Sequence, residues 1–271
     1  MTTARKVFIA IPVHDGALRV GTVMSLIEAM SSGTQAGIEF DVRCWVGDSL
    51  LPHARNTLVA QFMASDASEM IFIDSDISWA PGSITRLLSY PVDFVAGTYR
   101  FKNETEGYPV AWLREDNEVS EHGLFEVGCL PTGFFRMTRV GLERVIAKCA
   151  HLEYKSHNSN GMKLWCLFDL KLEHGLAWGE DYVFCNLVRS LGETLWLDPD
   201  LSLTHSGNKE YMGNFGAFIA AAERGKLPEE VQKERIAKLE TFARTFDTPA
   251  MNELFRQAAG EQAKTNGHAP A

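Results

Sequence analysis

The sequence has few cysteines, no long apolar run and no excess of positive charge. Its five cysteines are an odd number, widely spaced and without a C-x-x-C pair, so they predict free thiols in a reducing compartment. No run of about 18 apolar residues occurs, so no membrane span is expected. The formal net charge is −9 at pH 7, which argues against nucleic acid or an anionic membrane surface as the main partner.

Three common motifs are absent as well. No G-x-G-x-x-G follows the first predicted strand and no G-x-x-x-x-G-K-[ST] is present, which removes the usual dinucleotide-binding and P-loop classes. There is no G-x-S-x-G nucleophile elbow. Residues 1–6 lead directly into a strand pattern, so no signal peptide is expected and the cytoplasm is the predicted location.

The first 100 residues alternate between strand-like and helix-like patterns. The chain has 271 residues, 45% of them hydrophobic, which is enough for a large core. Apolar runs predict strands, and apolar residues at helical spacing predict the helices between them. The strands are expected at 6–13, 40–46, 70–73 and 92–97, with helices at about 20–30, 54–63 and 84–88. This order predicts an α/β fold with a mostly parallel sheet flanked by helices. The first helix is expected to face inward with Val20, Val23, Met24, Ile27 and Met30.

The rest of the chain has a less regular pattern. Short strands are expected at 109–113, 124–130, 134–137 and 194–197, helices at 142–149 and 180–191, and a loop lobe at 151–173. The residues after about 211 are expected to be mostly helical. We therefore predict a catalytic domain at 1–210, a helical extension at 211–259 and a flexible tail at 260–271.

Two acids follow the third predicted strand in the segment Asp74-Ser75-Asp76. Side chains at i and i+2 of a strand share a face, so both carboxylates can point into one small volume. Two carboxylates that close repel each other unless a cation lies between them. Mg²⁺ or Mn²⁺ fits this need and commonly also binds substrate phosphates. The alternative is an ordinary polar turn after a strand.

Several polar residues are expected at the same edge of the sheet. In parallel α/β sheets, ligands bind beyond the carboxyl ends of the strands. His14 and Asp15 follow the first strand, and Asp48 follows the second. The sequence therefore predicts that these side chains converge with Asp74 and Asp76 on one crevice.

Two further segments are candidates for contacts with a bound phosphate or sugar. Arg55 and Asn56 lie near the start of the second helix, where they could hold a phosphate or ribose; Arg55 could equally be a surface residue. Gly133, in the segment 131–135, would let a sugar ring approach the backbone, or would simply form a turn into a strand.

The late candidates are two acids, a histidine and a lysine. Glu180 and Asp181 open a predicted helix, where acids are stabilised by the helix dipole even without a catalytic role. The functional alternative makes Asp181 a general base. His205 is a plausible third metal ligand and Lys209 a phosphate contact, although a lone histidine is more often structural.

Taken in order, these segments resemble the glycosyltransferases of the GT-A fold, over roughly residues 7–209. The segment 9–14 resembles the opening strand and loop that hold the nucleotide, and Asp74-Ser75-Asp76 resembles the D-x-D motif. The resemblance implies that Asp76 binds the metal directly and that Asp74 contacts ribose or a metal-bound water. It also implies that Gly133 lies beside the donor sugar.

The late segments resemble motifs of two branches of the same family. Glu180-Asp181 resembles the pair whose Asp is the base in inverting members. The segment 205–209 resembles the His-x-x-Gly-x-x-Lys segment of retaining members, in which the His completes the metal shell, but here it is the shorter H-x-G-x-K. The stereochemical outcome is therefore left unassigned.

The resemblance implies a metal-dependent enzyme that transfers a sugar from a nucleoside-diphosphate sugar to a hydroxyl acceptor, such as a carbohydrate or glycoconjugate, with Mn²⁺ or Mg²⁺ as cofactor. Two alternatives stay open. One is a nucleotidyltransferase that makes nucleotide sugars, although the loop at 12–16 lacks the Gly-rich basic sequence expected of one. The other is a non-catalytic module that binds nucleotides or carbohydrates.

Overall fold

The computed structural model describes residues 5–113, 119–157, 159, 161–173 and 175–223. The chain divides into a compact unit, residues 1–219, and a second unit, residues 220–271. The described part of the second unit is the end of one helix, so the predicted helical extension lies mostly, and the predicted tail wholly, outside the described residues.

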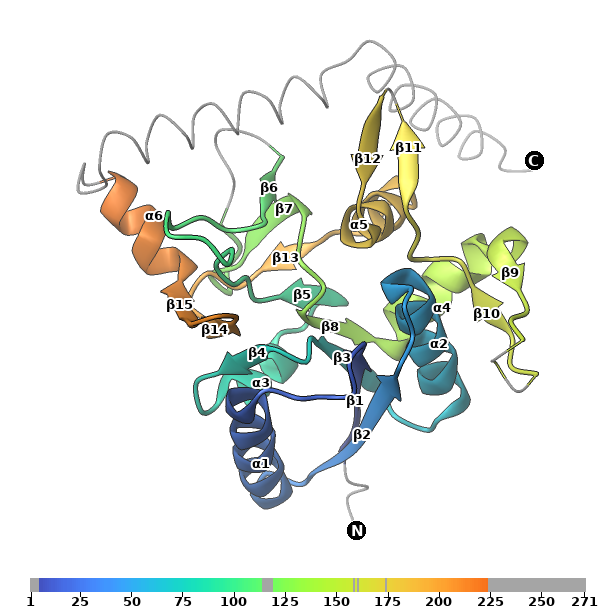
Figure 1. Cartoon of the computed structure of the whole chain (residues 1–271), viewed down its shortest axis with the longest axis horizontal. Helices are drawn as coiled ribbons and strands as arrows, with labels where there is room; N and C mark the ends of the chain where they lie inside the picture. The colour runs from blue at the N-terminus through green and yellow to red at the C-terminus, as the bar shows by residue number, and fades with distance from the viewer. Residues whose placement is uncertain (1–4, 114–118, 158, 160, 174, 224–271) are drawn as a thin grey trace, which may run out of the picture. The chain divides into compact units, whose positions relative to one another are not determined.

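The main sheet of the described residues contains eight strands in the order β2-β1-β3-β8-β5-β13-β7-β6 (Figure 1). Its strands are β1 (Arg5–Val13), β2 (Ile38–Val46), β3 (Glu69–Ile73), β5 (Phe94–Ala96), β6 (Ala111–Trp112), β7 (Phe125–Cys129), β8 (Phe134–Thr138) and β13 (Trp196–Leu197). β1 is parallel to β2 and β3, and β13 is parallel to β5. β7 and β8 run opposite to the other strands. The predicted α/β fold with a mostly parallel sheet is confirmed.

Helices cover both faces of this sheet. The helices of the described residues are α1 (Val20–Gln35), α2 (Leu51–Ala64), α3 (Ser83–Ser89), α4 (Arg139–Lys148), α5 (Glu180–Ser190) and α6 (Phe215–Glu223). α1 and α3 lie on one face, and α2, α4 and α5 lie on the other (Figure 1). Because β1 and β3 are covered on both sides, their residues are buried almost without interruption. None of the described helices has the length and apolar character needed to cross a bilayer.

The inward face predicted for α1 is wrong. Val20, Met24 and Ile27 are more than half exposed, whereas Thr22, Leu26, Ala29 and Gly33 are the buried residues. A Cβ added at Gly33 would lie 2.2 Å from the ring of Phe40 on β2. The helix therefore packs through its small residues, since these allow close approach to the sheet.

β8 is inserted between β3 and β5, where the sequence suggested an uninterrupted parallel series. It pairs antiparallel with both neighbours. The backbone hydrogen bonds between β3 and β8 continue past the end of β3, where the amide of Asp74 donates to the carbonyl of Gly133 at 3.0 Å. This pairing places the turn at 131–133 directly beside the first acid of the D-x-D segment.

A second, smaller sheet positions His205 near Asp76, the second acid of the D-x-D segment. It consists of β4 (Ile77–Trp79), β14 (Ser202–Ser206) and β15 (Glu210–Asn214), all antiparallel. The expectation of helix directly after 210 is wrong for β15; α6 begins only at Phe215. His205 pairs with Ile77, and the amide of Ser206 donates to the carbonyl of Asp76 at 2.8 Å. The backbone therefore sets His205 next to Asp76.

The loop lobe at 151–173 contains short regular elements. They are η1 (Ala150–Leu152), β9 (Glu153–Tyr154), β10 (Leu164–Trp165) and β11 (Lys171–Glu173). β11 forms an antiparallel hairpin with β12 (Leu176–Trp178), which leads directly into α5. This hairpin positions the two acids at the start of α5.

Candidate functional site

Asp76, which directly precedes β4, lies beside His205 on β14. Nδ1 of His205 lies 2.9 Å from the carbonyl oxygen of Arg100, so this nitrogen carries the proton and donates it. Nε2 lies 3.6 Å from Oδ1 of Asp76. In the neutral imidazole, Nε2 carries a lone pair that faces a carboxylate oxygen. Such a pair of donor atoms, with the far nitrogen held by a carbonyl, suits a divalent cation.

Asp76 is ionised in this environment. Burial alone would raise its pKa, but the neighbouring His205 and the ammonium of Lys102 outweigh that effect and lower the pKa. The ammonium of Lys102 contacts Oδ2 of Asp76. Asp76 thus already holds one cation, and its second oxygen faces the histidine.

Asp74 is held by a different set of partners. Nη2 of Arg55 lies 2.9 Å from its Oδ1, and the hydroxyl of Tyr99 lies 3.4 Å from its Oδ2. A Cβ at Gly133 would lie 2.4 Å from Oδ2 of Asp74, so this position accommodates only glycine without a shift. The Tyr99 ring also contacts the His205 ring, with centroids 4.8 Å apart. Tyr99 therefore connects the surroundings of the two acids.

Arg55 is the central cation of the cluster. Only 1% of the residue is exposed, which excludes the surface alternative. Its Nε lies 3.5 Å from Oε1 of Glu180. Burial opposes its charge, but Asp74, Asp181 and Glu180 together raise its pKa. Among the described residues, buried Nε and Nη1 find no hydrogen-bond partner, and such donors ordinarily require one.

Asp181 is a buried carboxyl held by the turn at 131–133. The hydroxyl and amide of Thr132 lie 3.1 and 3.4 Å from its two oxygens. Burial, opposed by Arg55 and reinforced by Glu180, raises the pKa of Asp181 to about 6. A carboxylate with this pKa is ionised at pH 7 and still accepts a proton readily.

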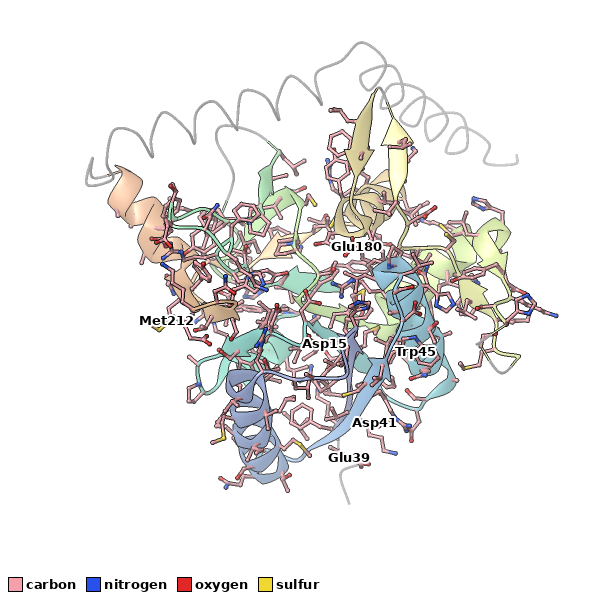
Figure 2. The ribbon with its side chains drawn as sticks, viewed as in Figure 1. Asp15, Glu39, Asp41, Trp45, Glu180 and Met212 are labelled. Atoms are coloured by element: carbon pink, nitrogen blue, oxygen red, sulfur yellow. The ribbon has the colours of Figure 1, made fainter. Side chains whose placement is uncertain are left out.

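Three predicted residues lie in the loops after β1 and β2. His14 and Asp15 are exposed; Nδ1 of His14 lies 3.0 Å from the carbonyl oxygen of Asp48. The carboxylate of Asp48 accepts from the Trp45 indole, the Leu50 amide and His53. Figure 2 labels Asp15 in the loop after β1, Trp45 on β2 and Glu180 at the start of α5. Within the described part of the chain, the side chains of His14, Asp15 and Asp48 make no hydrogen bond or ion pair to the cluster around Arg55.

Asn56 and Lys209 are engaged elsewhere. The amide of Asn56 donates to the carbonyl of Phe168 and accepts from the amides of Leu167 and Phe168, all within 3.1 Å. Its side chain anchors the loop lobe to α2. The ammonium of Lys209 lies 2.6 Å from both carboxylate oxygens of Glu104 on the surface.

Sequence reasoning missed Tyr99, Lys102 and Thr132. Tyr99 and Lys102 follow β5, so the rule that ligands bind beyond the carboxyl ends of strands could have identified that segment. Thr132 could not be found in this way, because its contact with Asp181 depends on the insertion of β8.

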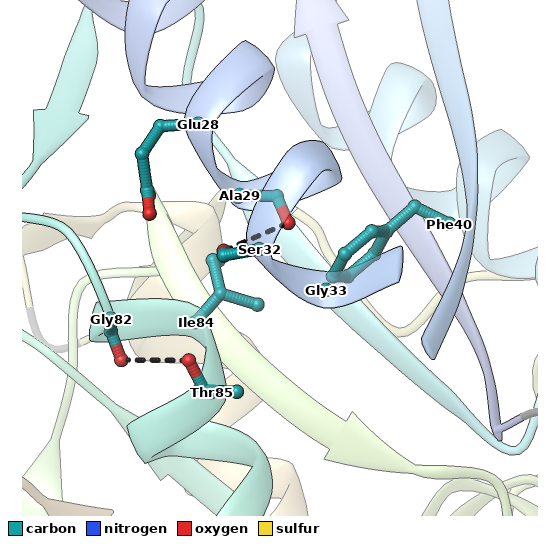
Figure 3. Close-up of a pocket in the computed structure, with 8 residues that line it drawn as sticks. All are labelled: Glu28, Ala29, Ser32, Gly33, Phe40, Gly82, Ile84 and Thr85. Carbon is teal, nitrogen blue, oxygen red and sulfur yellow. Dashed lines mark hydrogen bonds between the residues drawn. The ribbon is translucent and has the colours of Figure 1, made fainter. Parts of the chain in front are cut away.

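No group of three His, Cys, Asp or Glu side chains that could hold a metal occurs in the described part of the chain. A metal at Asp76 and His205 would need further ligands from a substrate, as phosphates provide. A separate small pocket, between α1 and α3, lies away from these residues (Figure 3). It is lined by Glu28, Ala29, Ser32, Gly33, Phe40, Gly82, Ile84 and Thr85.

Comparison with known proteins gives matches in structure alone. No family model matches the sequence, and no curated protein does. Protein A197 from STIV is 18% identical, covering 78% of this chain and 94% of its own, with a TM-score of 0.47. GalNAc-T7 with UDP, GalNAc and Mn²⁺ is 12% identical, covering 75% of this chain and 44% of its own, with a TM-score of 0.45. An inositol-1-phosphate CTP transferase from T. maritima is 13% identical, covering 90% of this chain and 97% of its own, with a TM-score of 0.36.

Proposed function

We propose that this protein transfers a sugar from a nucleoside-diphosphate sugar to a hydroxyl acceptor, with a divalent cation at the diphosphate. The observation that carries the proposal is that two groups of polar side chains lie in the same region of the fold. Asp76 and His205 offer a carboxylate oxygen and an imidazole lone pair 3.6 Å apart. Arg55 and Asp181 add a buried cation and a carboxyl whose pKa is about 6.

Asp76 and His205 would hold Mn²⁺ or Mg²⁺, with the diphosphate supplying further oxygen ligands. The cation would supply charge neutralisation for the leaving diphosphate. The carbonyl of Arg100 fixes the tautomer of His205, so that Nε2 stays available as a ligand. Asp74, held by Arg55 and Tyr99, would orient the ribose or a metal-bound water beside this site.

Asp181 would take the proton from the attacking hydroxyl, and Thr132 keeps its carboxylate in place. Arg55 keeps Asp181 ionised near neutral pH, since its positive charge lowers a pKa that burial raises. If the configuration of the sugar is retained, Asp181 would instead orient the sugar. His14, Asp15 and Asp48 remain candidates for contacts with the nucleoside at the neighbouring loops.

The proposal is tested by incubating the protein with a panel of nucleoside-diphosphate sugars, with and without Mn²⁺. Release of nucleoside diphosphate that needs Mn²⁺ and disappears in Asp76→Asn supports sugar transfer. Consumption of a nucleoside triphosphate and a sugar phosphate with release of pyrophosphate would support the nucleotidyltransferase alternative. Binding without any turnover would support the non-catalytic module.

A further inference from the structure

The segment after β5 brings Lys102 to the place where a metal ion would bind. Its ammonium contacts Oδ2 of Asp76, while Oδ1 of the same carboxylate faces His205. Asp76 is about one quarter exposed and Lys102 is 38% exposed at the side chain, so solvent reaches the pair. A charge pair in this setting is weak enough to exchange.

The surrounding residues leave room for this lysine. A Cβ at Gly207 would lie 3.1 Å from Cδ of Lys102, so the stem of the lysine passes over a glycine. The amide of Phe101 donates to the carbonyl of Gly107 at 2.9 Å, which closes the segment into a loop. Glu104, in the same loop, binds the ammonium of Lys209. Glu104 therefore attaches this loop to the turn between β14 and β15 at the surface, while Lys102 extends to Asp76.

We propose that Lys102 is the counter-ion of Asp76 when the site is empty, that a divalent cation displaces it, and that the displaced ammonium then binds the diphosphate of the donor. This inference rests on the proposed function and adds a residue to it. The flexible four-carbon stem lets the ammonium move without unfolding the loop. Displacement frees Oδ2 of Asp76 for the cation, and the incoming diphosphate replaces the carboxylate as the partner of Lys102.

The exchange has two opposite consequences for binding. Without a phosphate ligand, Lys102 competes with the metal for Asp76, so removing the ammonium should strengthen the binding of Mn²⁺ alone. With the metal in place, Lys102 contributes to the binding of a diphosphate, so the same removal should weaken that binding. A purely structural salt bridge would not produce this reversal of sign.

The test compares wild type with Lys102→Met and Lys102→Arg by titrating Mn²⁺ alone, read from the electron paramagnetic resonance signal of free Mn²⁺. Inorganic pyrophosphate is then titrated by calorimetry at saturating Mn²⁺. We expect Lys102→Met to bind Mn²⁺ at least 3-fold more tightly (on the order of the ~0.7 kcal/mol of an exposed ion pair) and pyrophosphate at least 3-fold more weakly. Lys102→Arg keeps the charge and should stay close to wild type in both titrations.

Lys163→Met is the matched control, because Lys163 is an exposed lysine paired with Glu153 at 3.2 Å and lies in the loop lobe. It should leave both affinities unchanged, and a melting curve confirms that each variant is folded. Equal or weaker Mn²⁺ binding by Lys102→Met would overturn the inference while leaving the metal site intact. Absence of Mn²⁺ binding in every variant would overturn the metal site itself, and the inference with it.

Discussion

Nε2 of His205, on β14, lies 3.6 Å from Oδ1 of Asp76, which directly precedes β4 of the same small antiparallel sheet. The pairing of β4 with β14 fixes this distance, and the carbonyl of Arg100 fixes the imidazole tautomer. The backbone therefore sets the two side chains side by side before any ligand is present.

Replacing His205 with alanine should lower the affinity for Mn²⁺ by roughly 10-fold or more, because a nitrogen ligand is lost. Calorimetric titration of Mn²⁺ in the presence of inorganic pyrophosphate measures the change. His157→Ala, at an exposed histidine of the loop lobe, serves as the control. Equal affinities in the two variants would remove His205 from the metal site.

Activity should rise with pH through about 6 and then level off. The active form of a general base is the carboxylate, so protonation of Asp181 below its raised pKa of about 6 removes activity. Asp181→Asn should lower the rate by roughly 10²–10⁴-fold. The increase of activity with pH should also disappear in this variant. A rate of donor turnover measured from pH 5 to 8 provides the readout. A wild-type profile that is flat across this range would contradict the role of Asp181.

Gly133→Ala should disturb Asp74 and reduce donor turnover. The added Cβ would lie 2.4 Å from Oδ2 of Asp74 and 2.5 Å from the hydroxyl of Tyr99. Gly179→Ala is the matched control, since a Cβ there meets nothing within 4 Å. We expect at least a tenfold loss for Gly133→Ala (roughly 1.4 kcal/mol in transition-state free energy) and little change for the control. Equal rates would show that the close approach is not needed.

Arg55→Met should destabilise the fold. Removing the buried guanidinium leaves the carboxylates of Asp74, Glu180 and Asp181 without their shared cation. Loss of one partner of a buried ion pair costs roughly 3–5 kcal/mol. The melting temperature at pH 7 should fall by roughly 6–20 °C, and lowering the pH to 5 should recover part of it, because Asp181, whose pKa burial raises to about 6 and which then lacks the opposing charge of Arg55, becomes neutral. A melting temperature equal to that of wild type would contradict this assignment.

The sequence predicted those parts of the site that depend on local pattern. Apolar runs located β1 and β3, and Asp74 and Asp76 follow β3 at the carboxyl edge of the sheet, where the strand-end rule puts them. The same rule points to the segment of Tyr99 and Lys102 after β5, but the contacts of these residues and of Arg55 with the two acids depend on long-range packing that the sequence pattern does not show.

The orientation of α1 shows a second limit of the sequence. Its sequence offers two faces, one of large apolar residues and one containing Ala29 and Gly33, and hydrophobic periodicity favours the first. Packing selects the second, because the Phe40 ring occupies the space where a larger residue at Gly33 would lie. β15 was missed for a related reason, since its pairing with β14 is a tertiary feature that the apolar pattern does not show.

In the proposed function, a divalent cation held by Asp76 and His205 binds the diphosphate of a donor. Thermal shift with a panel of nucleoside diphosphates, with and without Mn²⁺, tests it most directly, because a ligand that binds only the folded state raises its apparent stability. We expect a rise in melting temperature for at least one nucleoside diphosphate in wild type, a rise that requires Mn²⁺ and is absent from Asp76→Asn. A rise of the same size without Mn²⁺, or one that persists in Asp76→Asn, would contradict it.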